Sequence, residues 1–463
     1  MGAGKSTLGP ALAERLGRPF VSVDAVVEEQ TGSSVAQLFA ERGEAGFREL
    51  EERTAQELLL RRNLSVVELG GGGLGAAATR DALAASAFTL HLETTPDEAW
   101  ERVAGNGRPL ARDPAEFRAL YAQRRELYER TADGSARDVD GAVLAAAGIH
   151  VAAGAVERLG ELVPGAGAIE LVLDGGVEQL HGGLVRAALG ERLAASHVVP
   201  AGERAKTLAE AERLWSAVRL GRDGTVLALG GGSTLDVAGF VAATYLRGIA
   251  WVPVPTTLVG QVDAAIGGKT AVDLPEGKNL VGAFHWPARV VADMELLETL
   301  PATELANGLA EVVKTGLLAG EPLWELQAAE QVRRCAAFKA AVCLRDPLDR
   351  GERAQLNLGH TFAHALEAAS AYELPHGRAV GLGLLAALRL SGLEEDARTV
   401  AELLRPEPVR VDREAAWAAL ARDKKAAHGR PRLVLLETPG KPRIGVELDE
   451  DDVRAALDSL IVV

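Results

Sequence analysis

Short apolar runs that end in glycine or a polar residue place the strongest constraint on the fold of this 463-residue chain. Three of them are AIELVLD (168–174), TVLALGGG (225–232) and AWVPVPTTL (250–258), and stretches of helical periodicity separate them. Strands that are apolar on both faces are typical of parallel sheets covered by helices. Ligands of such sheets bind at the carboxyl ends of the strands. The sequence therefore predicts an α/β unit with a site at that edge.

The length of the chain predicts more than one domain. Residues 1–144 alternate helical periodicity with short apolar runs, such as NLSVVELGGGG, which we interpret as a buried strand. Residues 145–294 contain the three runs above. From 295 to 463 strands nearly vanish and helical patterns predominate, among them GERAQLNLGHTFAHALEAAS (351–370). We place the first boundary near 145, before the strand-like IHV, rather than at the Pro-Gly-Ala-Gly stretch that follows.

The composition of the chain limits the partners and the cellular compartment that we expect for it. The chain has 50 basic and 65 acidic residues, a formal charge of −15, which argues against nucleic acid or an anionic membrane as partner. Two cysteines, Cys335 and Cys343, form no disulfide framework, so we expect a reducing compartment. No apolar run reaches membrane-spanning length. We expect a cytoplasmic protein, although Met1-Gly2 with Ser6 also fits an N-myristoylation pattern.

The chain opens with MGAGKSTLG, which matches the second half of the phosphate loop GxxxxGK[ST]. In such a loop Gly2 and Gly4 let backbone amides close around phosphate. Lys5 reaches the β- and γ-phosphates, and Ser6 holds Mg²⁺ at the start of a helix. A chance run of glycines is the alternative interpretation.

Together with FVSVDAVVEE, GEAGFRELE, VVELGGGG, GRPLARD and YAQRRELY, the loop resembles shikimate kinase over nearly all of residues 1–144. The resemblance implies a P-loop kinase-like domain with a parallel sheet that binds ATP with Mg²⁺. It implies ATP contacts at Gly2, Gly4, Lys5, Ser6 and Arg108, the last in a lid. It implies shikimate contacts at Asp24, Arg48, Gly70, Gly71, Gly72 and Arg124.

Two departures from that family pattern are visible. The family has a strand before the loop, and here none precedes it, so we expect that the start codon is assigned too late. Decay of the kinase half is the alternative, and the persistence of the lid and substrate arginines counts against it. The family also has Asp-x-Asp where this chain has Ser22 and Asp24, which removes a carboxylate near the metal.

Three of the nine histidines, His360, His364 and His376, fall within 17 residues. His360 and His364 share one face of a predicted helix, and this spacing alone nominates the pair as metal ligands. Histidines hydrogen-bonded within a helical core are the alternative.

A glycine turn, LALGGGSTLDVAGF, follows a predicted strand and opens a helix. Its glycines, Gly230 to Gly232, would admit a dinucleotide pyrophosphate, although a plain strand–helix connection explains them equally well. Lys269, Lys278 and Lys314 stand in otherwise apolar or glycine-rich surroundings, which suits an anionic substrate.

The motifs PTTL, GGKT, GKNLVGAFHWP, AEVVKTG and LNLGHTFAH, in this order, resemble 3-dehydroquinate synthase across residues 145–463. The resemblance implies a Rossmann-like α/β domain for NAD (145–294) and an α-helical metal domain (295–463). It assigns Zn²⁺, or Co²⁺ on similar ligands, to Glu311, His360 and His376, and makes His364 a substrate contact instead of a ligand. Gly176, where the family has Asn, and Asp349, where it has Glu, are departures.

The same resemblance implies two larger sets of residues. The NAD contacts are Asp174, Glu203, Lys206, Gly231, Gly232, Asp236, Thr256, Thr257, Thr299 and Glu304. The catalytic and substrate residues are Lys269, Lys314, Arg247, Asp263, Lys278, Asn279, Lys339, Arg353, Asn357 and His364, with Lys424 or Lys425.

These resemblances predict a bifunctional enzyme of aromatic biosynthesis. The second part would convert 3-deoxy-D-arabino-heptulosonate 7-phosphate to 3-dehydroquinate and phosphate, and the first would phosphorylate shikimate with ATP. One alternative is a synthase whose kinase-like module only binds a ligand. Another is a polyol dehydrogenase, against which the lysines count, because a neutral polyol offers them no anion. The resemblance further suggests a homodimer through the synthase part.

Overall fold

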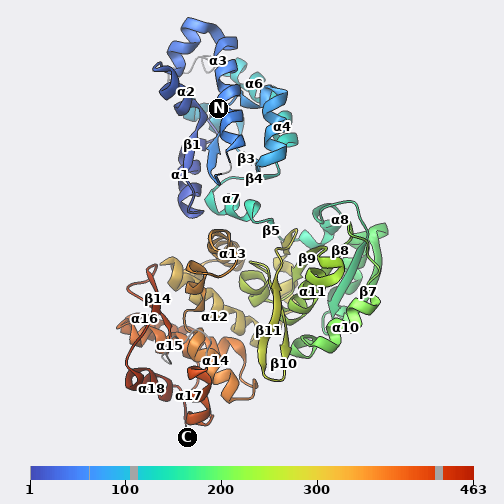
Figure 1. Ribbon diagram of the computed structural model, residues 1–463, viewed down its shortest axis with the longest axis vertical. Helices are drawn as coiled ribbons and strands as arrows, with labels where there is room; N and C mark the ends of the chain where they lie inside the picture. The colour runs from blue at the N-terminus through green and yellow to red at the C-terminus, as the bar shows by residue number, and fades with distance from the viewer. Residues whose placement is uncertain (1, 62, 105–112, 423–430, 463) are drawn as a thin grey trace. The chain divides into compact units, whose positions relative to one another are not determined.

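The computed structural model describes residues 2–61, 63–104, 113–422 and 431–462. The chain divides into two compact units, Met1–Ala147 and Gly148–Val463 (Figure 1). The expected further division at 294/295 stays a prediction, because residues 148 to 463 form one unit. Among the described residues, no helix combines the length and the apolar character that crossing a bilayer requires.

The described residues of the first unit alternate helices with four short strands. Its strands are β1 (Phe20–Ser22), β2 (Val66–Glu68), β3 (Leu90–Leu92) and β4 (Gly134–Ala136). Its helices are α1 (Lys5–Arg15), α2 (Val23–Thr31), α3 (Val35–Leu60), α4 (Ala77–Ser86), α5 (Pro96–Val103), α6 (Pro114–Thr131) and α7 (Val139–Ala146). Two helix starts carry complete capping boxes, one from Ser34 and Gln37 and one from Thr95 and Glu98.

The strands of the first unit form two separate parallel pairs among the described residues. β1 pairs with β2, and β3 pairs with β4. Both pairs are parallel, so the expectation of parallel strands in this unit is confirmed. The strand expected in NLSVVELGGGG is confirmed as β2, but its three residues are half-buried instead of buried. Helices α2 and α3 supply the apolar core beside the first pair, where Val23, Leu38 and Phe47 are buried.

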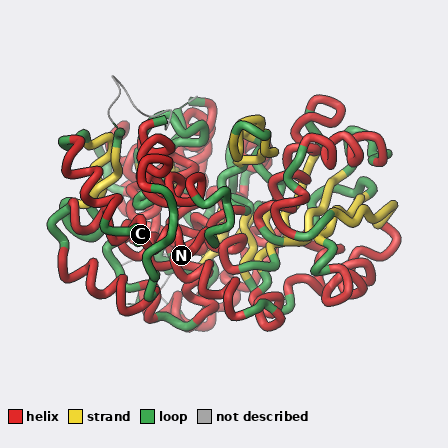
Figure 2. The backbone as a smooth tube through the Cα atoms, turned by 90° about the horizontal axis from the view of Figure 1, so that it is seen from below, coloured by secondary structure: helices red, strands yellow, loops and turns green. Residues whose placement is uncertain are grey.

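The second unit contains a four-stranded parallel sheet, ordered β7-β6-β8-β9. Two of the apolar runs form its central strands, β6 and β8, in which every residue is buried. The third run forms β9 at one edge of the sheet. Helices pack around this sheet, whereas helices with few strands fill the rest of the unit (Figure 2). The strands of the unit are β5 (Ile149–Val151), β6 (Ile169–Asp174), β7 (Leu193–Val199), β8 (Thr225–Gly230), β9 (Ala250–Pro255), β10 (Lys269–Leu274), β11 (Gly277–Phe284), β12 (Val290–Ala292), β13 (Leu433–Leu436) and β14 (Pro442–Val446).

Its helices follow in two groups. Those that accompany the sheet are α8 (Leu159–Leu162), α9 (Gly183–Leu189), α10 (Leu208–Ala217) and α11 (Gly232–Thr244). Those of the helical part are α12 (Ala302–Ala319), α13 (Ala328–Arg345), α14 (His360–Ala369), α15 (His376–Leu390), α16 (Glu394–Leu404), α17 (Arg413–Ala421) and α18 (Glu450–Asp458). One apolar core, with Phe362, Leu384 and Leu435 among its members, joins these helices to the antiparallel pair β13–β14.

One expected helix is interrupted. The stretch 351–370 forms a 3₁₀ segment, Glu352–Asn357, followed by α14. Gly359 stands between them with a φ of 77°, a left-handed conformation that glycine adopts without steric cost. The break places His360 in the first turn of α14.

Candidate functional sites

Glu311, His360 and His376 converge in the second unit. They come from α12, α14 and α15, and one donor atom from each lies within 4.8 Å of the other two. The Nε2 atom of His376 lies 3.2 Å, and that of His360 3.5 Å, from the same oxygen, Oε1 of Glu311. A carboxylate and two imidazoles are the donor set of catalytic zinc sites.

Close approach of the three helices produces this convergence, and glycines permit it. A Cβ atom on Gly377, beside His376, would lie 2.3 Å from the Cα of Asn307 on α12. A Cβ on Gly383 of α15 would lie 2.0 Å from the carbonyl oxygen of Gly359. Any larger residue would force the helices apart, so these glycines let α15 pack directly against both neighbours.

The outer nitrogens of the two imidazoles are also engaged. Nδ1 of His376 lies 3.1 Å from Oε1 of Glu367, and Nδ1 of His360 lies 3.2 Å from the carbonyl oxygen of Leu358. Such bonds orient metal-binding histidines and fix their tautomers. Burial alone would lower the pKa of His376, but its hydrogen bonds to Glu311 and Glu367 raise that pKa to about 10. The surroundings of His376 therefore favour a positive charge at its imidazole ring.

A buried lysine stands next to the cluster. Lys314, one turn after Glu311 on α12, pairs with its carboxylate, and both side chains are at most 2% exposed. Burial opposes ionisation of Glu311, but Lys314 and the two imidazoles outweigh it and hold the pKa of the carboxyl well below its ordinary value. Lys314 also lies 3.6 Å from Asp263, which receives a second ion pair from Lys339 at 2.7 Å.

A pocket of the second unit gathers further cations. Lys269, Asn279, Lys339 and Arg353 line it together with Asp263 and other residues. The Arg353 side chain is buried, and Lys269 pairs with Asp349 at 2.6 Å. The structure thus brings five of the predicted catalytic and substrate residues to one pocket, in which Asp349 stands at the position where the sequence departs from the family pattern.

The remaining predicted substrate residues that the structure describes are not among those that line this pocket. Lys278 pairs with Glu203 at 3.1 Å and lies over the ring of Tyr372. Asn357 donates to the carbonyl of Ala354, and Arg247 is exposed. The ring of His364 contacts that of His360 edge-on, but His364 does not join the three-residue group. Lys424 and Lys425 lie outside the described residues.

The residues predicted to contact a dinucleotide gather at the carboxyl ends of β6, β8 and β9. Asp174 ends β6 and accepts hydrogen bonds from the backbone amides of Gly176 and Gly202. Gly231 caps α11 directly after β8, and the amide of Thr256, after β9, donates to the carbonyl of Gly230. Parallel sheets bind ligands at this edge.

Ion pairs and hydrogen bonds tie neighbouring members of the dinucleotide set together. Glu203 accepts from the hydroxyl of Ser233 at 2.5 Å, and Lys206 pairs with Asp236 at 2.6 Å. Gly232 begins α11, and Thr257 accepts from the amide of Gly260. Thr299 bonds with His181, which is not a member of the predicted set. Glu304 is exposed in the first turn of α12.

In the first unit, the glycine loop leads directly into α1. Gly2 and Gly4 have φ values of 72° and 87°, and Lys5 and Ser6 open the helix. A Cβ on Gly2 would lie 2.2 Å from the carbonyl oxygen of Ala99, so only glycine fits there. The hydroxyl of Ser6 donates to Oε1 of Glu68 at 2.8 Å. Arg108 lies outside the described residues.

The predicted shikimate residues surround a carboxylate that the sequence did not single out. Arg48 pairs with Glu51 at 2.5 Å and with Glu44 at 3.2 Å. A Cβ on Gly70 would lie 2.0 Å from Oε1 of Glu51 and 3.0 Å from Oδ1 of Asp24. Burial raises the pKa of Glu51 above its ordinary value, although Arg48 opposes this shift.

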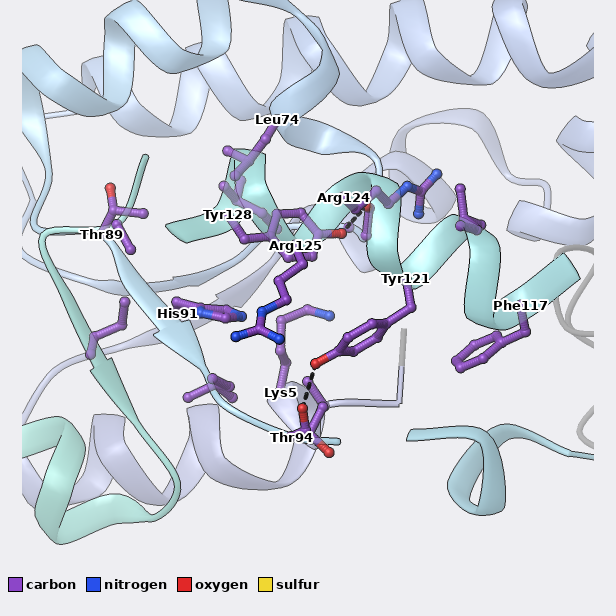
Figure 3. A pocket seen from close by; sticks show the side chains of 18 residues that line it. Lys5, Leu74, Thr89, His91, Thr94, Phe117, Tyr121, Arg124, Arg125 and Tyr128 are labelled. Atoms are coloured by element: carbon purple, nitrogen blue, oxygen red, sulfur yellow. Dashed lines mark hydrogen bonds between the residues drawn. The ribbon is translucent and has the colours of Figure 1, made fainter. Parts of the chain in front are cut away.

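A pocket beside this group contains the helix-opening lysine. It is lined by Lys5, Gly70, Gly71 and residues of β3 and α6, including Arg124 and Arg125. Figure 3 shows Lys5 and Arg125 pointing into the pocket, whereas Arg124 extends away from it. The hydroxyl of Tyr128 donates to the carbonyl of Gly71 at 2.5 Å, which fixes the glycine segment against α6.

Three acidic residues at these sites were missed by the sequence analysis. Glu51 lies three residues after Arg48 on α3, a spacing that could have suggested the pair. Glu367 lies on α14 three residues after His364, but its partner His376 belongs to another helix. Glu68 ends β2, and no local pattern connects it with Ser6, because the packing of α1 against β2 creates their contact.

Comparisons with known proteins divide the chain close to the boundary between its two compact units. Residues 1–143 match the family described as "Shikimate kinase". Residues 196–307 match "3-dehydroquinate synthase N-terminal", and residues 308–426 match "3-dehydroquinate synthase C-terminal". The 3-dehydroquinate synthase of Symbiobacterium thermophilum is 42% identical over 351 residues, which cover 67% of this chain and 97% of that protein.

Two solved structures share the fold of the second unit. One is 2-deoxy-scyllo-inosose synthase in complex with carbaglucose-6-phosphate, NAD⁺ and Co²⁺, with a TM-score of 0.61 and 25% identity over 68% of this chain and 96% of that one. The other is 2-epi-5-epi-valiolone synthase from Streptomyces hygroscopicus with NAD⁺ and Zn²⁺. Its TM-score is 0.60, with 26% identity over 67% of this chain and 96% of that one.

Proposed function

The chain belongs to the 3-dehydroquinate synthase family and carries a shikimate kinase domain over residues 1–143, and on that premise we propose the reactions of its two units. The second unit converts 3-deoxy-D-arabino-heptulosonate 7-phosphate to 3-dehydroquinate and phosphate. The first unit phosphorylates shikimate with ATP. The observation that carries the proposal is the cluster of Glu311, His360 and His376 beside the buried Lys314.

Glu311, His360 and His376 would hold a divalent cation, Zn²⁺ or Co²⁺. The donor set fits such a cation, and Glu367 and the Leu358 carbonyl orient the imidazoles as metal sites require. When bound, the cation would supply Lewis-acid polarisation of a substrate hydroxyl, and NAD⁺ would supply a hydride acceptor. Structures of similar fold with NAD⁺ and Co²⁺ or Zn²⁺ support this assignment.

The lysines and arginine of the neighbouring pocket would bind the anionic groups of the substrate. Lys269, Lys339 and Arg353 meet in one pocket, and Asp263 and Asp349 compensate their charge there. A substrate phosphate or carboxylate that enters the pocket can replace these aspartates as the ion-pair partner of the cations. Concentrated cations in one pocket explain how a chain with a charge of −15 binds an anionic substrate.

The turn after β8 would hold the pyrophosphate of NAD. Gly231 and Gly232 expose backbone amides at the start of α11, where a helix N-terminus favours negative charge. Asp174 and Thr256 flank that turn from the two neighbouring strands. Thr299 and Glu304 stay predictions of the family pattern, as do Arg247, Asn357 and His364 on the substrate side.

In the kinase unit, Lys5 and the loop amides would hold the ATP phosphates and Ser6 would bind Mg²⁺. Arg48 and Asp24 would hold shikimate at the glycine segment 70–72, where Glu51 fixes the guanidinium of Arg48. Arg124 is proposed as a further shikimate contact on α6. We also propose assembly as a homodimer through the second unit, which light scattering of the purified chain would test.

Phosphate release tests the synthase reaction. The full chain is incubated with the heptulosonate phosphate and NAD⁺, before and after chelation and after return of Zn²⁺. We expect phosphate and 3-dehydroquinate in equal amounts, loss on chelation and recovery with metal. Steady production of NADH from glycerol instead would favour a polyol dehydrogenase.

ATP-dependent phosphorylation of shikimate tests the kinase reaction in the same preparation. Shikimate 3-phosphate and ADP are the expected products. Binding of shikimate without turnover would leave the second unit as a synthase joined to a non-catalytic binding module.

A further inference from the structure

We propose that Glu68 supplies the carboxylate that orders the divalent cation of the kinase unit, in place of the one that is absent at Ser22. The inference rests on the kinase function proposed above. The related pattern has Asp-x-Asp at positions 22 to 24, and Ser22 carries no charge. A chain that keeps the rest of the loop therefore needs another carboxylate at the metal.

Strand pairing puts Glu68 beside position 22. Ser22 ends β1 and Glu68 ends β2, and the two residues are direct register partners in the parallel pair. Partners on adjacent parallel strands lie about 4.8 Å apart and project to the same side of the sheet. A carboxylate on Glu68 thus extends from the same edge as a carboxylate at position 22 would.

Contact with the loop fixes the direction of the side chain. Ser6, the residue expected to bind Mg²⁺, donates its hydroxyl to Oε1 of Glu68 at 2.8 Å. The carboxylate of Glu68 is therefore one hydrogen bond away from the predicted metal ligand. Asp24 is on the substrate side of the unit, since its Oδ1 lies close to Gly70 and the Glu51 carboxylate.

The chemistry of the cation requires such a group. Mg²⁺ in kinases is held by one or two carboxylates together with hydroxyl, water and substrate phosphates. With a neutral hydroxyl at Ser22, Glu68 is the described carboxylate in contact with Ser6. Its side chain is one methylene longer than that of aspartate, which suits an approach from the neighbouring strand.

Metal binding in the presence of nucleotide tests the proposal. The synthase site of the full chain is first loaded with Zn²⁺, and Mn²⁺ is then titrated with and without ADP, with free Mn²⁺ followed by electron paramagnetic resonance. In Glu68→Gln we expect the ADP-dependent Mn²⁺ affinity to fall by about tenfold or more. The amide still accepts the hydrogen bond from Ser6, so a purely structural acceptor would lose nothing.

Matched variants make the outcome decisive. Glu57→Gln removes an equal charge from an exposed position of α3 and should bind Mn²⁺ like the unaltered chain. Adding Ser22→Asp to Glu68→Gln should restore most of the lost affinity, and a double variant no better than Glu68→Gln would refute the equivalence of the two positions. An unchanged Mn²⁺ affinity in Glu68→Gln would overturn the role of Glu68 and leave the proposed kinase function standing. Failure of the unaltered chain to bind Mn²⁺ with ADP would overturn the kinase function itself.

Discussion

Glu367 and His376 form a hydrogen-bonded pair in which the carboxylate lies 3.1 Å from Nδ1, while Nε2 of the same ring faces Glu311. Glu367 therefore acts on the proposed metal through the imidazole. We expect Glu367→Gln to weaken Zn²⁺ binding by roughly 10- to 100-fold, measured by competition with a chelator. Glu402→Gln, an exposed change on α16, should leave the affinity unchanged. Equal affinities in all three proteins would refute the positioning role.

The contact of α15 with α12 gives a second prediction. In Gly377→Ala the new methyl group would lie 2.3 Å from the Cα of Asn307, so α15 must move outward. We expect a loss of about 1–3 kcal/mol in the free energy of unfolding, measured in urea, and weaker Zn²⁺ binding. Gly183→Ala meets no atom within 4 Å and serves as the control. If both variants lost equal stability, the proposed packing constraint would be wrong.

The glycine segment of the kinase unit gives a third prediction. A Cβ on Gly72 would lie 2.2 Å from Cζ of Arg48, so Gly72→Ala displaces the guanidinium proposed to bind shikimate. The KM for shikimate should rise about tenfold, whereas the KM for ATP should stay unchanged. Gly75→Ala, in the same segment but with open space around it, should leave both values unaltered. A rise in the KM for ATP alone would contradict the assignment.

The carboxyl group of Glu203 gives a prediction of pH dependence. Burial opposes its ionisation, but the Ser233 hydroxyl, Lys206 and Lys278 outweigh burial and lower its pKa from 4.5 to about 2. The folded state stabilises the ionised carboxylate of Glu203 more than the unfolded state does. Its contribution to the free energy of unfolding is therefore present above about pH 4.5 and is lost as the pH falls toward 2. The unfolding free energy of the unaltered chain should exceed that of Glu203→Gln by a constant amount between pH 7 and 5. The difference should shrink at lower pH, and a difference independent of pH would refute the linkage.

Elements with a strong local signal could be predicted, and those made by long-range pairing could not. Continuous apolar residues predicted β6, β8 and β9, since burial on both faces leaves its mark on each strand. The antiparallel hairpin β10–β11 was missed, because its glycines and lysines show no clear alternation. At the site, helical spacing could only connect His360 with His364. The carboxylate of Glu311 lies 49 positions earlier in the chain, and the resemblance, not the spacing, nominated it.

The three proposed ligands stand on three helices that are far apart along the chain, at positions 311, 360 and 376. They meet only after α12, α14 and α15 have packed together, with Gly359 and Gly377 in contact with their neighbours. We therefore expect the proposed ion to be captured late in the folding of this unit. A nascent or partly folded polypeptide would offer single donors with little affinity, so it would not compete with finished enzyme for scarce zinc.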